Sequence, residues 1–298
     1  MEIRKIPFYY YYRLLKWNRF SDRSPIGASL KITARCNLRC RHCPWDKNPA
    51  TDISLDEWKS RIDGLYARGV VVTVIEGGEP TLYPGVSELI DYVKFKGMYS
   101  ILITNATTSI SGLSPHVFWV SLDGMEKNND KIRGPGTFDK AVATIAQNMD
   151  KKIVTLTSLS RNNVSDIEPL CSILSPLVHG IMFNFTYPYA VIAEECLDAR
   201  ERREAAAKIL SLKSRYPKIL NSNSYLKSVG RKKIVTPWLL TTVMCDGTEI
   251  QGCMVRHIEK ENCLNCDMGC CVELSNTYMM KRDSVKFWNR SFGLTRFI

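Results

Sequence analysis

Ser29-Leu-Lys-Ile-Thr33 and the following Cys36-Asn-Leu-Arg-Cys40-Arg-His-Cys43 are the stretches that decide the fold of this chain. The first alternates apolar and polar residues, which is typical of a strand, so the cysteines lie on the loop that leaves it. Three thiolates at this spacing can wrap one small inorganic cluster, whereas a closed tetrahedral zinc site needs a fourth ligand. We expect an iron–sulfur cluster with one iron left open to an exogenous ligand. A zinc site completed by His42 is the alternative.

Length and composition place the chain among globular proteins. It has 298 residues, of which 45% are hydrophobic and 24% charged, and a formal net charge of +11. This length predicts one large domain and a smaller one. No stretch reaches the roughly 18 apolar residues of a membrane span, and the N-terminus lacks the layout of a cleavable signal. We therefore expect a cytoplasmic protein in a thiol-reducing compartment, with closely spaced cysteines serving as metal ligands or reactive thiols.

A second motif follows the next predicted strand. Ser54-Leu-Asp-Glu57 is a capping box that opens a helix, and Val70 to Ile75 is a β-branched run suited to a buried strand. Glu76-Gly-Gly-Glu-Pro80 comes directly after it. The two glycines allow backbone to approach a ligand closely, and Glu79 supplies a hydrogen-bond acceptor. Taken alone this motif would be a turn, but its place downstream of the cysteine triplet favours a binding role.

The spacing C-x3-C-x2-C after the first strand resembles the signature of the radical S-adenosylmethionine (SAM) enzymes. The resemblance implies that Cys36, Cys40 and Cys43 are catalytic and hold a [4Fe–4S] cluster. It implies further that the open iron chelates the amino and carboxylate groups of SAM, which is cleaved reductively to a 5′-deoxyadenosyl radical. An electron donor such as ferredoxin or flavodoxin would then be a partner. His42 takes the position at which the family usually has an aromatic residue near the adenine.

Further polar residues lie at predicted strand ends. Ser121-Leu-Asp-Gly124 and Asp130-x-x-Arg133-Gly134 resemble the radical SAM branch that carries SPASM-type C-terminal domains. By this resemblance Glu79 would accept from the methionine ammonium, Ser121 and Asp123 would face the ribose hydroxyls, and Arg133 would face the methionine carboxylate. An ordinary strand-end polar residue or cap is the alternative for each. The cofactor-binding residues implied are His42, Gly77, Gly78, Glu79, Asn105, Ser121, Asp123 and Arg133.

Strands and helices alternate from about residue 28 to 215, which predicts six βα units and ligands at the carboxyl ends of parallel strands. The expected fold is α/β and resembles the partial (β/α)6 TIM-type barrel of the family, followed by a small cysteine-rich domain. The expected regions are a basic aromatic N-terminal helix (1–25), the barrel (26–215) and the cysteine-rich auxiliary domain (216–298).

Six cysteines gather near the C-terminus. Residues 239–255 predict two strands around an Asp-Gly turn, with Cys253 at the far end, and Cys263-Leu-Asn-Cys266-Asp-Met-Gly-Cys270-Cys271 follows. The layout resembles a shortened SPASM or twitch domain, which implies one auxiliary [4Fe–4S] cluster. We expect Cys253, Cys263, Cys266 and Cys270 as metal ligands, with Cys245 or Cys271 as substitutes. A structural four-cysteine zinc ribbon is compatible with the same spacing.

Basic and aromatic residues are concentrated at both ends. Residues 8–20 form a plausible amphipathic helix, and residues 286–292 repeat its chemistry, so both could dock on an anionic membrane. The alternative is that these helices pack on the barrel with solvated cationic heads. Our first hypothesis is therefore a radical SAM enzyme acting on a lipid, isoprenoid or other small molecule, peripherally at the membrane. The second is a peptide- or protein-modifying enzyme of SPASM type, and the third a non-catalytic zinc or iron–sulfur protein that binds nucleic acid, although no nucleic-acid-binding motif is clear.

Overall fold

The computed structural model describes residues 12, 24–43, 51–187, 190–231, 233, 235–258, 263 and 266–292. The predicted N-terminal helix at residues 8–20 lies outside these residues, apart from Tyr12. The elements described are β1 (Gly27–Lys31), α2 (Leu55–Ala67), β2 (Val72–Glu76), α3 (Val86–Phe95), β3 (Tyr99–Thr104), β4 (Val117–Ser121), α4 (Glu126–Arg133), α5 (Thr137–Gln147), β5 (Ile153–Leu159), α6 (Ile167–Leu174), β6 (Gly180–Phe185), α7 (Ala199–Leu212), α8 (Asn223–Ser228), β7 (Leu240–Val243), β8 (Glu249–Gln251), α9 (Met254–Ile258), α10 (Gly269–Tyr278) and α11 (Arg282–Phe292), with short 3₁₀ turns at Pro80–Leu82, Val164–Asp166, Ala190–Glu195 and Pro237–Leu239.

A single curved sheet organises the molecule. Its strand order is β6-β5-β4-β3-β2-β1-β7-β8, and every neighbouring pair is parallel except β7 with β8. Strands β1 to β6 confirm the predicted parallel order. One connection differs from a regular βα unit, because β3 and β4 are joined by a loop, residues 105–116, rich in Ser, Thr, Gly and Pro. The carboxyl ends of β1 to β6 therefore meet at one edge of the sheet.

The predicted Asp-Gly hairpin forms, but it joins the main sheet. Strand β7 pairs in parallel with β1, starting at Gly27 opposite Leu240, and β8 follows as the outermost strand. An added Cβ at Gly27 would lie 2.9 Å from Leu240 Cδ2, so glycine permits this close pairing. The predicted region boundaries stay predictions, and the structure adds that the chain after residue 216 contributes two strands to the barrel sheet.

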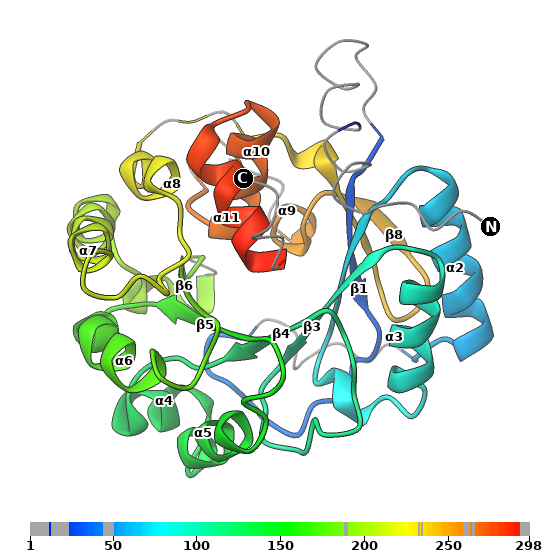
Figure 1. Ribbon diagram of the computed structural model, residues 1–298, viewed down its shortest axis with the longest axis horizontal. Helices are drawn as coiled ribbons and strands as arrows, with labels where there is room; N and C mark the ends of the chain where they lie inside the picture. The colour runs from blue at the N-terminus through cyan, green and yellow to red at the C-terminus, as the bar shows by residue number, and fades with distance from the viewer. Residues whose placement is uncertain are drawn as a thin grey trace.

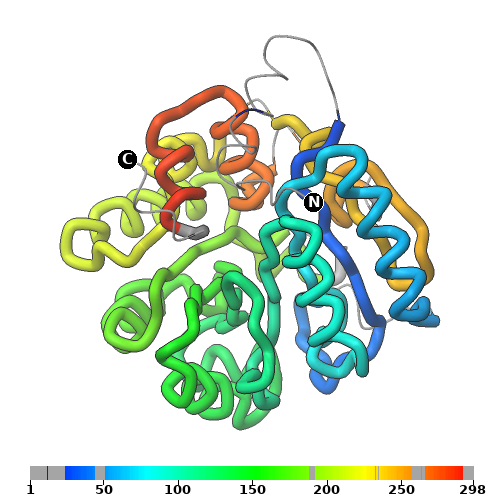
Figure 2. The backbone as a smooth tube through the Cα atoms, turned by 45° about the vertical axis from the view of Figure 1, so that its right-hand side comes forward, coloured from blue at the N-terminus to red at the C-terminus, as the bar shows by residue number. Residues whose placement is uncertain are grey.

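Helices cover the two faces of the sheet differently (Figure 1). Helices α2 to α7 lie along the convex face, where the larger apolar core forms. On the concave face, Ile101 and Trp119 of the strands pack in a second core with Leu274 of α10 and with Phe287 and Trp288 of α11. The turned view shows α10 and α11 in the opening between β1 and the α7–α8 pair (Figure 2). The C-terminal helices thus occupy the inside of the partial barrel.

This packing decides between the two interpretations of the C-terminal basic aromatic segment. Phe287 and Trp288 are buried in the barrel interior, whereas Lys286 and Arg290 on the same helix are exposed. The packed interpretation is therefore confirmed for the described side chains of α11, and Phe287 and Trp288 are not available to a membrane. In the described part of the chain, no helix combines the length and apolar character needed to cross a bilayer.

Candidate functional site

The first three cysteines lie on the loop after β1, as predicted. Cys36 is exposed, and Cys40 and Cys43 are partly buried. The loop is held by the backbone N–H of Arg41, which donates to the carbonyl of Ile132 in α4 at 2.9 Å. Burial raises the pKa of Cys40 to about 11 and also raises that of Cys36. Metal binding at these thiols therefore releases protons, as metal binding by cysteine generally does.

The glycines of the second motif bring its backbone against the cysteine loop. The N–H of Gly78 donates to the carbonyl of Thr33, and the N–H of Glu79 donates to that of Arg35, both at 2.8 Å. An added Cβ at Gly78 would lie 2.7 Å from the carbonyl carbon of Arg35, and one at Gly77 would lie 2.5 Å from the carbonyl oxygen of Thr33. The close approach that these glycines permit is therefore an approach to the neighbouring loop, which sets the position of the triplet.

Glu79 connects this motif to the next strand end. Its side chain is almost fully buried, and Oε1 accepts from the hydroxyls of Thr81 and Thr104, both at 2.8 Å. Oε2 accepts from the backbone N–H of Asn105 at 2.8 Å. Asn105 Nδ2 in turn donates to Asn37 Oδ1 of the cysteine loop at 2.9 Å. The carboxylate therefore braces the loops after β2 and β3, and its predicted contact with a ligand ammonium stays a prediction.

Asp123 and Arg133 form a buried ion pair beside the triplet. Arg133 Nη2 lies 2.6 Å from Asp123 Oδ2, and Asp123 Oδ1 accepts from the backbone N–H of Ser158 at 2.7 Å. His42 Nε2 lies 3.6 Å from Asp123 Oδ2, and burial lowers the His42 pKa, which favours the neutral imidazole. The guanidinium also opposes the rise in the pKa of Cys40. A cation is thus fixed next to the predicted cluster ligands.

Two atoms of this pair, Arg133 Nε and Asp123 Oδ2, have no hydrogen-bond partner within the described residues, although Asp123 Oδ2 takes part in the ion pair. Arg133 Nε is buried and makes no hydrogen bond. A buried unpaired donor costs about 1–3 kcal/mol, so an acceptor bound here would remove that cost. This observation, together with three thiols on one loop, fits a [4Fe–4S] cluster with an amino-acid carboxylate beside it. Ser121 ends β4 with a hydroxyl that makes no hydrogen bond in the described part of the chain, so it remains free for a ligand.

The C-terminal cysteines divide between two cavities. A small cavity of about 20 Å³ is lined by Cys253, Cys263, Cys266 and Cys271. Cys270 lines a larger cavity, although its Sγ is only 3.9 Å from Cys271 Sγ. The structure thus groups Cys271 with the other three predicted ligands. Among the described residues, no three His, Cys, Asp or Glu side chains are arranged to bind a single metal ion, so the grouping rests on the shared cavity.

Cys245 does not join this group. It lies in the turn between β7 and β8, whereas Cys253 follows β8 at the other end of the hairpin. Burial raises the Cys245 pKa to about 11, with a smaller contribution from Asp52 near the first cysteine loop. The auxiliary segment itself is anchored by Asp267, which forms an ion pair with Arg202 of α7 at 3.2 Å and accepts from the N–H of Gly230.

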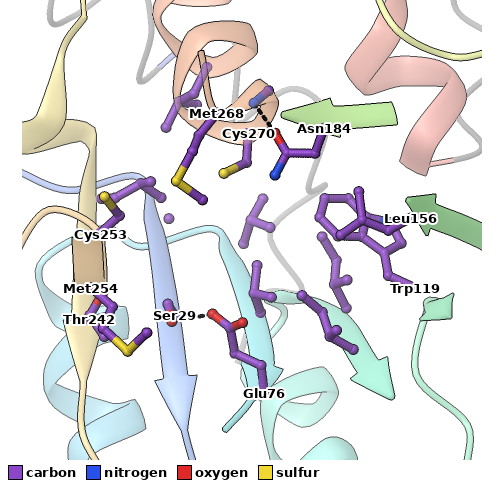
Figure 3. Close-up of a pocket in the computed structure, with 18 of the residues that line it drawn as sticks. Ser29, Glu76, Trp119, Leu156, Asn184, Thr242, Cys253, Met254, Met268 and Cys270 are labelled. Atoms are coloured by element: carbon purple, nitrogen blue, oxygen red, sulfur yellow. Dashed lines mark hydrogen bonds between the residues drawn. The ribbon is translucent and has the colours of Figure 1, made fainter. Parts of the chain in front are cut away.

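The larger cavity lies inside the barrel, between the strands and helices α10 and α11. It measures about 220 Å³, and its wall is mainly apolar, with Cys253 and Cys270 at the auxiliary end (Figure 3). Opposite them, Ser29 Oγ donates to Glu76 Oε1 at 2.5 Å and Lys31 Nζ lies 3.0 Å from Glu76 Oε2. Sequence reasoning gave these three residues no role. The feature of the sequence that could have indicated them is a set of polar residues at alternate, inward-facing positions of strands that are otherwise apolar.

Comparisons with known proteins agree with this geometry. The family model described as Radical SAM superfamily matches residues 30–172, which include the cysteine triplet and Arg133. Fe-coproporphyrin III synthase of Methanosarcina barkeri (strain Fusaro / DSM 804) is 32% identical over 206 residues, covering 63% of this chain and 51% of that protein. Mycofactocin maturase MftC of Mycobacterium tuberculosis (strain CDC 1551 / Oshkosh) is 31% identical over 166 residues, covering 51% of this chain and 42% of that protein. The chain spans about half, or less, of the length of these relatives.

Solved structures show the same fold. Streptococcus suis SuiB bound to S-adenosylmethionine has a TM-score of 0.69 at 14% identity, covering 96% of this chain and 70% of that one. SuiB bound to precursor peptide SuiA has a TM-score of 0.67 at 15% identity, covering 97% of this chain and 70% of that one. The likeness confirms the partial barrel with a cysteine-rich C-terminal region.

Residues 30–172 of this chain therefore form a radical SAM domain. Its relatives and structural neighbours include maturases of the SPASM and twitch type, as the resemblance predicted. The cofactors of this superfamily are a [4Fe–4S] cluster and SAM, and SPASM-type relatives carry auxiliary clusters.

Proposed function

We propose that this chain cleaves SAM reductively at the cluster held by Cys36, Cys40 and Cys43 and uses the resulting radical to modify a side chain of a peptide or protein. The observation that supports this most directly is the barrel cavity, which extends from Lys31 and Glu76, near the strand ends that carry the SAM motifs, to the auxiliary cysteines Cys253 and Cys270. A substrate in this cavity would lie between the two predicted metal sites.

The peptide class is favoured by the relatives. MftC is a maturase, and SuiB has been solved with a precursor peptide. The lipid hypothesis finds no corresponding support, because none of these relatives is described as acting on a lipid and the aromatic residues Phe287 and Trp288 of α11 face the barrel interior. A non-catalytic nucleic-acid-binding protein finds none either. We therefore prefer the second of the three hypotheses.

Individual residues of the chain would have distinct roles in binding the cluster and SAM. Cys36, Cys40 and Cys43 would hold a [4Fe–4S] cluster, which would supply the electron for SAM cleavage. Arg133 Nε would donate to the methionine carboxylate, and Asp123 keeps the guanidinium in place through the 2.6 Å ion pair. Glu79 holds the loops after β2 and β3 in place through Thr104 and Asn105. Ser121, at the end of β4, would face the ribose hydroxyls. The apolar wall of the cavity would keep water from the reacting centre.

The test is formation of 5′-deoxyadenosine by anaerobically reconstituted protein under a chemical reductant. Cys40→Ala should reduce the rate at least about a hundredfold, because it removes one of three cluster ligands. Cys171→Ala is the matched control, since Cys171 of α6 is buried in the larger apolar core and lines neither cavity, and its rate should stay within about twofold. Equal rates for Cys40→Ala and the unmodified chain would refute the proposal.

The substrate class needs a second experiment. A synthetic peptide library should increase 5′-deoxyadenosine formation and yield peptides of altered mass, whereas isoprenoid lipids should do neither. Turnover of a lipid or a porphyrin in the absence of any peptide reaction would contradict the peptide assignment while leaving the SAM chemistry intact.

A further inference from the structure

Asn184 of β6 links the barrel cavity to the auxiliary cysteine segment. Its Oδ1 accepts from the backbone N–H of Gly269, the first residue of α10, at 2.5 Å. The first N–H groups of a helix have no partner within the helix, and the N-cap residue Met268 makes no side-chain cap. Asn184 therefore supplies the acceptor from a neighbouring strand. Glycine permits the contact, because an added Cβ at Gly269 would lie 3.3 Å from the Tyr225 hydroxyl and 3.4 Å from Asn184 Oδ1.

This hydrogen bond also fixes the orientation of the carboxamide. Only the oxygen of an amide accepts from a backbone N–H, so Nδ2 of Asn184 must point the other way. Figure 3 shows it directed away from α10 and into the cavity. Within the described residues Nδ2 donates to no acceptor, and the cavity wall around it is mainly apolar. The cavity therefore presents an oriented donor with no acceptor supplied by the protein.

The rest of the cavity indicates which kind of ligand would accept a hydrogen bond from Asn184 Nδ2. Its apolar part is lined by Val74, Ile101, Ile103, Trp119, Leu156 and Met182. Its volume of about 220 Å³ exceeds the roughly 150 Å³ of an apolar protein cavity known to hold benzene. Among the other polar side chains of the wall, Glu76 is already engaged by Ser29 and Lys31. The Thr242 hydroxyl donates to the carbonyl of Gly252. A ligand with one carbonyl oxygen and one bulky apolar group would therefore satisfy both features.

We propose that Asn184 is a specificity-determining residue that donates from Nδ2 to a carbonyl oxygen of the substrate, and so orients a bulky apolar side chain of a peptide in the barrel cavity. This rests on the proposed function. The carbonyl would be that of the peptide backbone next to the side chain. Because Asn184 also accepts from Gly269, two positions along the chain from Cys271, substrate binding and the auxiliary segment share one carboxamide.

Acetophenone and ethylbenzene are suitable probes, because they share an aromatic ring and differ chiefly in one carbonyl oxygen. Saturation-transfer NMR would measure their binding to the anaerobically reconstituted chain. Asn184→Asp keeps the acceptor for Gly269 but, when ionised, has no donor, so acetophenone affinity should fall about tenfold, equivalent to about 1.4 kcal/mol. Ethylbenzene affinity should change less than about threefold. Asn223→Asp on α8 places the same new charge outside the cavity and should leave both affinities unchanged.

Two results would overturn the proposal. Equal acetophenone affinity in Asn184→Asp and the unmodified chain would show that Nδ2 is not the donor. Failure of both probes to bind the unmodified chain would show that the cavity does not take this ligand class. Iron content of each variant is measured in parallel, so that loss of the auxiliary segment is seen separately. Deoxyadenosine formation by the unmodified chain needs neither probe, so failure of this inference is distinct from failure of the proposed function.

Discussion

Gly78→Ala tests how the second motif positions the first. An alanine Cβ would lie 2.7 Å from the carbonyl carbon of Arg35 and 3.0 Å from the carbonyl oxygen of Ala34. These are backbone atoms, so no side-chain rotation relieves the overlap. The backbone of the cysteine loop must move away from that of Gly78, just upstream of Cys36.

The cost follows from the contacts that hold the two loops together. Moving them apart stretches the hydrogen bonds from Gly78 to Thr33 and from Glu79 to Arg35, each 2.8 Å long. A backbone hydrogen bond contributes about 0.5–1.5 kcal/mol, so losing both costs about 1–3 kcal/mol. At about 1.4 kcal/mol per tenfold, SAM affinity should fall by about 5- to 150-fold.

Equilibrium dialysis of radiolabelled SAM against anaerobically reconstituted protein measures this change, with iron content determined on the same samples. Gly64→Ala is the control, because an added Cβ at Gly64 in α2 meets no atom within 4 Å. Alanine in a helix is favourable by about 0.5–1 kcal/mol relative to glycine, so this variant should bind SAM normally. Unchanged SAM affinity in Gly78→Ala would refute the argument that these glycines position the cysteine loop.

Three further predictions concern other parts of the site. Cys271→Ser should lose most of the auxiliary iron, whereas Cys270→Ser should keep it, because of these two residues only Cys271 lines the small cavity. The reverse pattern in metal analysis would support Cys270 as the ligand. Arg133→Lys should weaken SAM binding about tenfold in the same dialysis assay, because lysine keeps the charge but lacks the Nε donor; unchanged affinity would remove Arg133 from the site. Burial raises the pKa of Glu273 from 4.5 to about 7, so the folded state favours the protonated acid. The contribution of this group to the free energy of unfolding is therefore complete below about pH 4.5 and is lost as the pH rises through 7. Glu273→Gln should remove this pH-dependent loss of stability, which amounts to up to about 3 kcal/mol, in thermal unfolding measured between about pH 5 and 8. Parallel curves of stability against pH for the variant and the unmodified chain would contradict the prediction.

The catalytic half of the site could be predicted because parallel strands bring distant motifs together. The cysteine triplet follows β1, the Gly-Gly-Glu-Pro motif follows β2 and Asp123 follows β4, so their meeting at one sheet edge follows from strand order alone. The β-branched and apolar runs that form these strands are local features of sequence. No long-range contact had to be guessed to place them.

Features that depend on tertiary surroundings could not be predicted in this way. Glu79 was expected to face a ligand, but which donors surround a carboxylate depends on loops distant in sequence. Cys270 and Cys271 are adjacent, yet successive residues of a helix point about 100° apart and so reach different cavities. The aromatic and basic pattern of α11 suits a membrane surface and a barrel interior equally, and only the packing of Phe287 and Trp288 decides between them.

We propose that the iron left open by Cys36, Cys40 and Cys43 binds SAM directly. Electron paramagnetic resonance of the reduced, anaerobically reconstituted protein tests this most directly, with a Cys266→Ser variant used to reduce the auxiliary contribution. We expect a [4Fe–4S] signal from the triplet whose shape changes when SAM is added. A cluster signal that is identical with and without saturating SAM, or no such signal from the triplet, would contradict it.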